Sequence, residues 1–532
     1  MRKFSLCWMS LALAFAQAPA TPPAEKPVTL LKGLGTWHHP IATRNPDAQK
    51  FFDQGLTLLY GFNRYEALRS FTRAAQLDPM AAMAWWGVAM ATGPSINMDL
   101  DGDVDMKKSC AAVESANKLT NLSELERAWI GTVAVRCPEY QPKPYIAAMR
   151  ALRDRYPDDL DVLAWYAESL MVAVRWHWYD NAGRPAEGVE EAERVLEEIL
   201  RRRPDHPGAN HFYIHAVESS RNPERAIPSA ERLMGVVPAA GHLVHMPGHI
   251  WLVLGDYEMA AAVNERAAEV DREYMSATGV TASSYIGYYI HNMHFVAFAR
   301  SMQGRTSDSI RVADQISAAM KPMTDAMPEM VDAFDSLPLF TRVRGGRWDD
   351  LLASPAPPAR LAMTTALWHF ARALALQAKG RHDEAVREQT AFAEARAKVS
   401  PSALWGNNKP ADMFAIAEEV IAARLAQSSA AAVPRWQHAV ELQDALVYDE
   451  PPAWYYPLRE SLGAALLRSG KAADAEVVFR EGLRRSPRDG RMLFGLVEAL
   501  KTQKKTQAAE WVQRELDAAW KKSEVKLRLE DL

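Results

Sequence analysis

The sequence predicts an all-α protein built from about twelve helical hairpins, and three observations support this. Helical periodicity, interrupted by helix-ending Gly and Pro residues, recurs from about residue 47 to the end of the chain. Segments with the two-residue alternation of β-strands are almost absent. At 532 residues the chain also exceeds one ordinary domain, which favours several domains or an elongated repeat array.

One repeated unit is clearest near the C-terminus, within residues 461–487. Small alanines let two antiparallel helices approach closely, a glycine permits the turn between them, and a proline ends the second helix. The aromatic residue wedges between neighbouring hairpins. The residues in question are Leu462, Gly463, Gly470, Ala475, Phe479 and Pro487. Similar second halves occur at 63–79, 254–271 and 378–395.

This order of residues resembles the tetratricopeptide repeat, a 34-residue helix–turn–helix unit. The resemblance implies a right-handed superhelical solenoid with a concave inner groove, in a family known for binding proteins and peptides rather than for catalysis. Weaker units fill the rest of the chain, with an insertion at 177–188. They lie at 80–118, 123–157, 159–204, 207–238, 285–320, 327–354, 410–447 and 488–520.

The N-terminus predicts export. A basic start, a short apolar run and Ala16-Gln17-Ala18 before a Pro-rich stretch are typical of a cleaved signal peptide. We expect a periplasmic or secreted protein with no membrane span, because no other stretch is long and apolar enough. The predicted organisation is a signal peptide (1–18), an N-terminal linker (19–46), N-terminal hairpins (47–205), central His-rich hairpins (206–320) and C-terminal hairpins (321–532).

Charge and cysteine content narrow the partners and the compartment. The net charge of −4 gives no reason to expect nucleic acid as a partner. Cleavage of the signal peptide would leave Cys110 and Cys137, which in an oxidising compartment we expect to form one disulfide between neighbouring helices. The alternative is that both are small buried thiols.

Half of the histidines fall in one stretch. The chain has 14 histidines, and an even distribution would put about two of them between residues 211 and 294. Seven lie there: His211, His215, His242, His245, His249, His291 and His294.

The repeat gives each of these histidines a position. With Gly255 at repeat position 15, the seven fall on positions 2, 5 and 9 of three successive units, and Glu218 falls on position 12. In tetratricopeptide repeats these positions line the concave groove. Each set also spans only about 60° of its own helix, at about 100° per residue. The sequence therefore predicts a ribbon of imidazoles along the groove wall.

Imidazoles gathered on one surface favour a transition-metal site. We predict all seven as ligands, with copper favoured and iron or zinc as alternatives; calcium and magnesium prefer oxygen. Seven exceed the three or four that one ion needs, so either two ions share the site or some histidines support the others. Glu218 is the candidate catalytic carboxylate: it could bridge ions, orient a histidine or act as general base. Pro247 either kinks the helix or starts it, and a start would loosen the placement of His242 and His245.

The chain contains other aromatic residues and histidines beside this set. Tyr213, Tyr288, Tyr289, Trp176, His177 and Trp178 could shape a substrate pocket or simply pack between helices. His38 and His39 could add a ligand by folding back, although an exposed linker is the favoured interpretation. His206, His369, His382 and His438 are expected to be structural.

Three functions follow from these patterns. The first is a metalloprotein, such as a metal-dependent oxidoreductase acting on a small molecule or peptide in the groove, or a hydrolase if the metal is zinc. The second is a non-catalytic scaffold that binds a protein partner in the groove. The third is a protein for metal storage or delivery.

Overall fold

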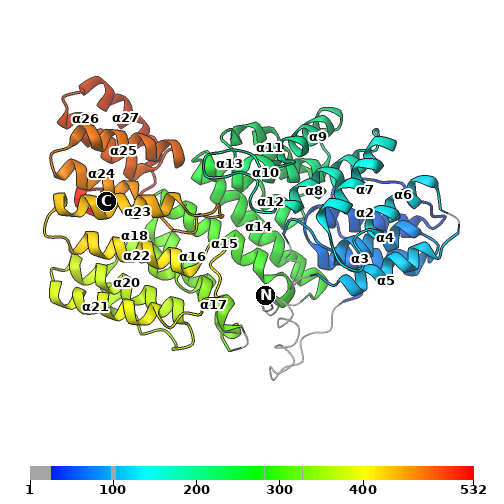
Figure 1. Ribbon diagram of the computed structural model, residues 1–532, viewed down its shortest axis with the longest axis horizontal. Helices are drawn as coiled ribbons and strands as arrows, with labels where there is room; N and C mark the ends of the chain where they lie inside the picture. The colour runs from blue at the N-terminus through cyan, green and yellow to red at the C-terminus, as the bar shows by residue number, and fades with distance from the viewer. Residues whose placement is uncertain (1–25, 98–103, 121, 281, 326) are drawn as a thin grey trace. The chain divides into compact units, whose positions relative to one another are not determined.

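The computed structural model describes residues 26–97, 104–120, 122–280, 282–325 and 327–532, and these residues form helices and no β-strand (Figure 1). Two isolated bridges, Tyr179 with Pro185 and Trp405 with Asn408, are the exceptions to helix and loop in this part of the chain. The predicted signal peptide lies outside the described residues. The chain divides into two compact units: unit 1 comprises 1–250 and 263–292, and unit 2 comprises 251–262 and 293–532.

Three of the first four hairpins of unit 1 begin with a side-chain cap that the sequence supplies, at Asn45, Ser123 and Asp159. Asn45 accepts hydrogen bonds from the first backbone N–H groups of its helix, and Ser123 forms a capping box with Glu126. The hairpins are α2 (Pro46–Tyr60) with α3 (Arg64–Leu77), α4 (Ala82–Thr92) with α5 (Met106–Asn117), α6 (Glu124–Ala134) with α7 (Pro142–Arg155), and α8 (Leu160–Ala173) with α9 (Val189–Arg202).

The next helices carry the histidines. Of the two outcomes expected for Pro247, a kink or a helix start, the structure shows a helix start. The first helix of this hairpin is therefore split into two short helices. The break stays short because Met246 N still donates to His242 O at 3.0 Å, so the chain keeps nearly helical spacing across it. The elements are α10 (Pro207–Glu218), η2 (Pro223–Ala226), α11 (Ile227–Val236), α12 (Gly241–His245), α13 (Pro247–Val253), α14 (Tyr257–Thr278) and α15 (Ala282–Met302).

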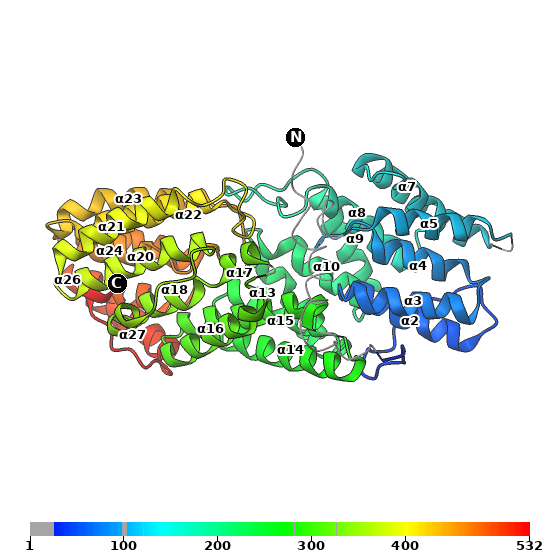
Figure 2. The same cartoon turned by 90° about the horizontal axis from the view of Figure 1, so that it is seen from below.

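Unit 2 continues the same alternation of antiparallel helices; α20 and α22 lie side by side in both views (Figures 1 and 2). The turn residues Gly255, Gly304, Gly380 and Gly470 all have φ between +69° and +84°, which only glycine adopts at little cost. The helices are α16 (Thr306–Met320), η3 (Lys321–Met323), α17 (Pro328–Phe334), α18 (Leu337–Arg344), α19 (Trp348–Ala353), α20 (Ala362–Ala378), α21 (His382–Arg396), α22 (Pro410–Leu425), α23 (Ser429–Asp444), α24 (Arg459–Arg468), α25 (Ala472–Arg485), α26 (Gly490–Thr502), α27 (Thr506–Ala519) and η4 (Leu529–Asp531).

The all-α class and the number of hairpins are confirmed: the described helices pair into about twelve hairpins at the expected places. The hand of a superhelix stays a prediction. Cys110 and Cys137 form the expected disulfide, with Cα atoms 5.7 Å apart. Among the helices that the structure describes, none has the length and hydropathy needed to cross a membrane.

Candidate metal centre

Six of the seven predicted histidines form two adjacent groups in unit 1. His211, His215 and His242 form the first trio, and His245, His249 and His291 form the second trio. Within each trio the three potential ligand nitrogens lie within 4.8 Å of one another. The trios adjoin one another, because the His242 and His245 rings, and likewise the His215 and His249 rings, have centroids 5.4 Å apart.

The two trios have nearly the same geometry. Ring centroids are 5.0, 4.8 and 6.2 Å apart in the first trio and 4.5, 4.8 and 6.2 Å apart in the second. In the repeat register each trio consists of positions 5 and 9 of one unit and position 2 of the next. Positions 5 and 9 are four residues apart and share a helix face, while position 2 comes from the packed neighbour. The repeat has therefore built the same three-histidine arrangement twice.

The Nδ1 atoms of four of these rings are held by oxygen. His211 Nδ1 contacts the backbone oxygen of Tyr60 at 2.5 Å, and His245 Nδ1 contacts Asn264 Oδ1 at 2.6 Å. His215 Nδ1 contacts Glu218 Oε1 at 2.9 Å, and His249 Nδ1 contacts Glu218 Oε2. A carbonyl or carboxylate oxygen only accepts hydrogen bonds, so each Nδ1 carries the proton and each Nε2 presents its lone pair.

The Nε2 atoms accordingly face one another. His245 Nε2 and His249 Nε2 lie 2.6 Å apart, and His211 Nε2 and His242 Nε2 lie 3.1 Å apart. For His245 and His249, whose Nδ1 atoms are both held by oxygen, two lone pairs so close repel unless a cation lies between them. His242 Nδ1 has no hydrogen-bond partner among the described residues, so His242 Nε2 can carry the proton and donate it to His211 Nε2. Two imidazole nitrogens that share one tetrahedral ion at about 2.0–2.1 Å are separated by about 3.3 Å. The His211–His242 separation is close to this value, and the His245 and His249 nitrogens would move apart by some tenths of an ångström to hold an ion.

A proton is a poor candidate for that cation. The pKa values of His211, His242 and His245 lie well below the usual range, first because the rings are buried and then because neighbouring histidines would repel a second positive charge. Neutral imidazole is the form that binds metal ions. Burial and crowding therefore disfavour protonation and leave the rings ready for a metal.

Glu218 joins the two trios. Its two carboxylate oxygens accept from His215 of the first trio and His249 of the second, and the side chain is buried with 2% of the residue exposed. Both oxygens are thus occupied by ligand imidazoles on the side away from the Nε2 atoms. Of the three roles expected for Glu218, this geometry favours orienting the histidines.

The rings are more enclosed than a groove wall. His211, His215, His242, His245 and His249 are all buried, with at most 2% exposed. The expectation that they line an open groove needs correction, because aromatic side chains cover them. The ring of Phe62, at the α2–α3 turn, lies 4.4 Å from that of His211 and 5.1 Å from that of His242.

His294 belongs to neither trio. It is assigned to unit 2, where its ring stacks on Tyr455 at an interplanar angle of 3° and meets the edge of Phe334. Burial lowers the pKa of His294 to about 4. Its repeat explains its isolation, because position 9 of that unit is Phe298 and the next histidine in the sequence is His369.

Some of the aromatic residues considered for a substrate pocket contact the histidine rings, and others do not. Trp176 and Trp178 contact the His215 ring, and Tyr288 contacts the His242 ring at 5.2 Å. Tyr213 instead donates to Glu197, and Tyr289 lies against Arg272. His177 is exposed.

The interpretation of His39 as part of an exposed linker is wrong. His39 is buried and its Nδ1 lies 2.8 Å from Asp161 Oδ2, while the exposed His38 pairs with Asp53. Asp161 also accepts from Tyr60 Oη at 2.6 Å and Trp37 Nε1 at 3.0 Å. With its oxygens occupied in this way, Asp161 fastens the N-terminal segment to α2 and α8 and is a poor metal ligand.

The other four histidines are placed as expected of structural residues. His206 caps α10 by accepting from Ala209 N. His369, His382 and His438 contact Glu388, Gln377 and Glu419 respectively.

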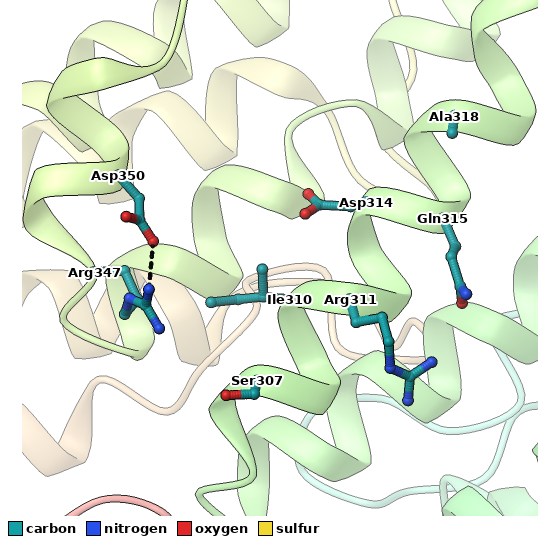
Figure 3. A pocket seen from close by; sticks show the side chains of 8 residues that line it. All are labelled: Ser307, Ile310, Arg311, Asp314, Gln315, Ala318, Arg347 and Asp350. Atoms are coloured by element: carbon teal, nitrogen blue, oxygen red, sulfur yellow. Dashed lines mark ion pairs between the residues drawn. The ribbon is translucent and has the colours of Figure 1, made fainter.

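A separate cleft of about 540 Å³ lies on unit 2, lined by residues of α16, α19 and the turn before α19 (Figure 3). Arg347 and Asp350 on its rim form an ion pair at 3.0 Å. The cleft contains none of the histidines or the carboxylate predicted from the sequence.

Three contributors to the site were missed by the sequence interpretation. The backbone oxygen of Tyr60 carries no side-chain signal. Asn264 lies on the second helix of its hairpin, outside the groove positions. Phe62 did leave a signal, because it occupies the turn position at which Gly255 and Gly470 stand in their own units, with φ of +54°.

Comparison with known proteins identifies the repeat. The family model of the tetratricopeptide repeat matches residues 461–523, so the hairpins there are tetratricopeptide repeats. No curated protein matches the chain. Two solved structures are similar at 12% identity: the human IFIT1 dimer with m7Gppp-AAAA, over 90% of this chain and 91% of that one with a TM-score of 0.34, and yeast Tom70, over 88% and 90% with a TM-score of 0.32. TM-scores this low carry no conclusion about fold or function.

Proposed function

We propose that unit 1 is a metal-binding repeat array that holds two transition-metal ions, one in each histidine trio. The observation that carries the proposal is the pair His245 and His249, whose Nε2 atoms face each other at 2.6 Å while both Nδ1 atoms are held by oxygen acceptors. This arrangement needs a cation, and burial opposes a proton. The first trio repeats the spacing of the rings, and there His211 Nδ1 and His215 Nδ1 are the two atoms held by oxygen acceptors.

The ligand set selects among metals. Three imidazoles per ion suit copper, iron or zinc; neither trio contains a thiolate, and of the three metals we favour copper. Glu218 supports the ligands from behind, as carboxylates commonly do for metal-bound histidines. Its buried negative charge also offsets part of the positive charge of two ions.

Bound copper or iron would supply electron-transfer or dioxygen chemistry, which makes the protein a candidate metal-dependent oxidoreductase for a small molecule or peptide; zinc would instead supply a water of lowered pKa for hydrolysis. In either case Glu218 is a positioning residue. The disulfide between Cys110 and Cys137 agrees with an oxidising compartment, so export to the periplasm or medium is part of the proposal.

The test is elemental analysis of untagged protein purified from its native compartment, followed by reconstitution with copper, iron and zinc in turn. We expect close to two equivalents of one metal per chain, retained on dialysis. Protein that holds no metal as purified and takes up none of the three ions would contradict the proposal.

A second candidate is a scaffold that binds a protein partner. It is favoured by the match of residues 461–523 to tetratricopeptide repeats and by the cleft on α16 and α19, which is open to solvent. It concerns unit 2 and is compatible with metal binding in unit 1. A metal storage or delivery protein would use the same trios but release its ions readily to a chelator.

A further inference from the structure

The two trios differ in how they are covered. Three aromatic residues besides Phe62 lie against the first trio: Trp176 and Trp178 against His215, with ring centroids 5.9 and 5.7 Å away, and Tyr288 against His242. The Phe62 ring itself contacts all three members of that trio, and Tyr288 Oη donates to the backbone oxygen of Phe62 at 3.3 Å. The first trio is therefore enclosed by a fixed aromatic cover.

Two residues of this cover have a left-handed backbone. Phe62 has φ of +54° and Trp176 has φ of +61°, values in the left-handed region that non-glycine residues rarely adopt. These are two of the four non-glycine residues with positive φ in the described part of the chain. The Phe62 ring lies against all three histidines of the first trio, and the Trp176 ring lies against His215.

The second trio differs from the first in the burial of its histidines. Of its three rings, His245 and His249 are buried and His291 is partly exposed; His242, which holds the same repeat position in the first trio, has only 2% of its surface exposed. His291 is thus the one member of the six histidines that is not buried. An ion that binds His245, His249 and His291 would meet water on the His291 side.

We infer that the two ions have different roles: the first trio holds an enclosed ion, and the second trio holds an ion with an open coordination position that takes a small monodentate ligand. This inference rests on the proposed function. Structural metal sites have closed coordination, whereas catalytic sites keep one position for water or substrate. The ligand class is limited to molecules of a few atoms, such as azide or dioxygen, because the adjoining rings are buried.

Glu218 gives this division a physical connection. One of its oxygens orients His215 of the enclosed trio and the other orients His249 of the open trio. A change in charge at the open ion is therefore felt by the enclosed ion through one hydrogen-bonded carboxylate, at a separation of a few bonds.

The experiment compares His242→Ala with His291→Ala, two substitutions at the same repeat position, in the full copper-loaded chain. Copper content is measured for each variant, and azide is then titrated while the azide-to-copper charge-transfer absorption is followed. We expect each variant to keep one ion. His242→Ala should retain the azide band with its affinity changed by less than about three-fold, and His291→Ala should lose it.

The outcomes separate the two claims. Wild-type protein that binds no copper would defeat the proposed function itself. If wild-type protein binds two coppers but the azide band is lost in His242→Ala and kept in His291→Ala, the inference is overturned and the metal centre stands. Loss of both ions from either single variant, or an unchanged band in both, would also overturn it.

A second variant tests the cover without removing a ligand. Phe62→Gly suits the left-handed backbone and removes the ring from the first trio. We expect copper release to a chelator to change from one fast and one slow phase to two fast phases, with the slow phase accelerated at least ten-fold. A slow phase that Phe62→Gly leaves unchanged would contradict the enclosure of the first trio.

Discussion

The two trios in unit 1 and the lone His294 in unit 2 start from the same repeat pattern and end differently. His211, His245 and His294 all occupy position 5 of their units, and the first two have a histidine at position 9. The third has Phe298 there, and its ring stacks on Tyr455 instead of meeting another imidazole. A histidine at position 5 therefore meets a second imidazole when position 9 is also histidine. It meets aromatic rings instead when position 9 is Phe298.

The comparison shows that a histidine trio depends on three positions together. Positions 5 and 9 place two rings on one face, and position 2 of the following unit supplies the third. The oxygen acceptor behind each pair then fixes which nitrogen faces inward. His294, which has only part of this pattern, packs against aromatic rings, and desolvation lowers its pKa to about 4.

The largest expected effect comes from breaking one trio. His245→Ala/His249→Ala should lose the ion of the second trio outright, since two of its three ligands are gone, and should leave about one equivalent of metal per chain. Elemental analysis checks this. The control is His294→Ala, which removes a histidine at the same repeat position and should keep two equivalents. Equal losses in the two variants would remove the distinction between the trios and His294.

Substituting the shared carboxylate should weaken both ions. Glu218→Gln keeps the size of the side chain but removes its charge and one of its two acceptors, and loss of such a supporting group typically costs 10–100-fold in metal affinity. Competition titration with a chromophoric chelator measures each affinity. Glu224→Gln, at an exposed glutamate of the same hairpin, is the control. A drop confined to one ion would show that Glu218 serves only one trio.

A smaller effect is expected from Gly248→Ala. A Cβ atom at Gly248 would lie 2.3 Å from Asn264 Nδ2, so the amide must move and release His245. The affinity of the second trio should fall by about ten-fold with the first trio unchanged. Gly235→Ala, in α11 where the added Cβ meets no atom within 4 Å, is the control. Chelator titration that showed both trios weakened equally would point to a general disturbance of the hairpin.

The smallest effect concerns His294 and appears only in acid. Its pKa is about 4 in the folded protein against 6.5 in the unfolded chain, so between these values the unfolded chain binds a proton that the folded chain does not. Stability therefore falls as the pH drops from 6.5 towards 4, and no such loss operates above pH 7. His294→Leu should recover about 1–2 kcal/mol at pH 4.5, less than the full shift implies because the ring is partly exposed.

Thermal unfolding of His294→Leu and wild type at pH 4.5 and pH 7.5 measures this difference. A gain that is the same at both values would arise from packing, and would exclude titration of His294 as its cause.

The sequence was sufficient for the hairpins because helix stops, turn glycines and small residues are local signals. It also placed six histidines correctly relative to one another, since repeat positions fix which side chains share a face. The disulfide followed from the two cysteines that lie outside the predicted signal peptide. These inferences need only the register of the chain and the packing of adjacent helices.

The remaining features depend on contacts distant in sequence. Tyr60 and Phe62 reach the first trio from a hairpin about 150 residues away, and a backbone oxygen leaves no mark in the sequence. Asn264 supports His245 from the second helix because Gly248 leaves room for it, a fact visible only in three dimensions. His294 was included because its position matched, although Phe298 was the residue that decided its surroundings.

The most direct test of the metal centre is anomalous diffraction from crystals of the copper-loaded protein, with data on both sides of the copper edge. The account predicts two anomalous peaks, one within about 2.0–2.1 Å of the Nε2 atoms of each trio, with Glu218 behind both and no peak at His294. A single peak elsewhere, or crystals in which His245 Nε2 and His249 Nε2 still face each other with no metal between them, would contradict it.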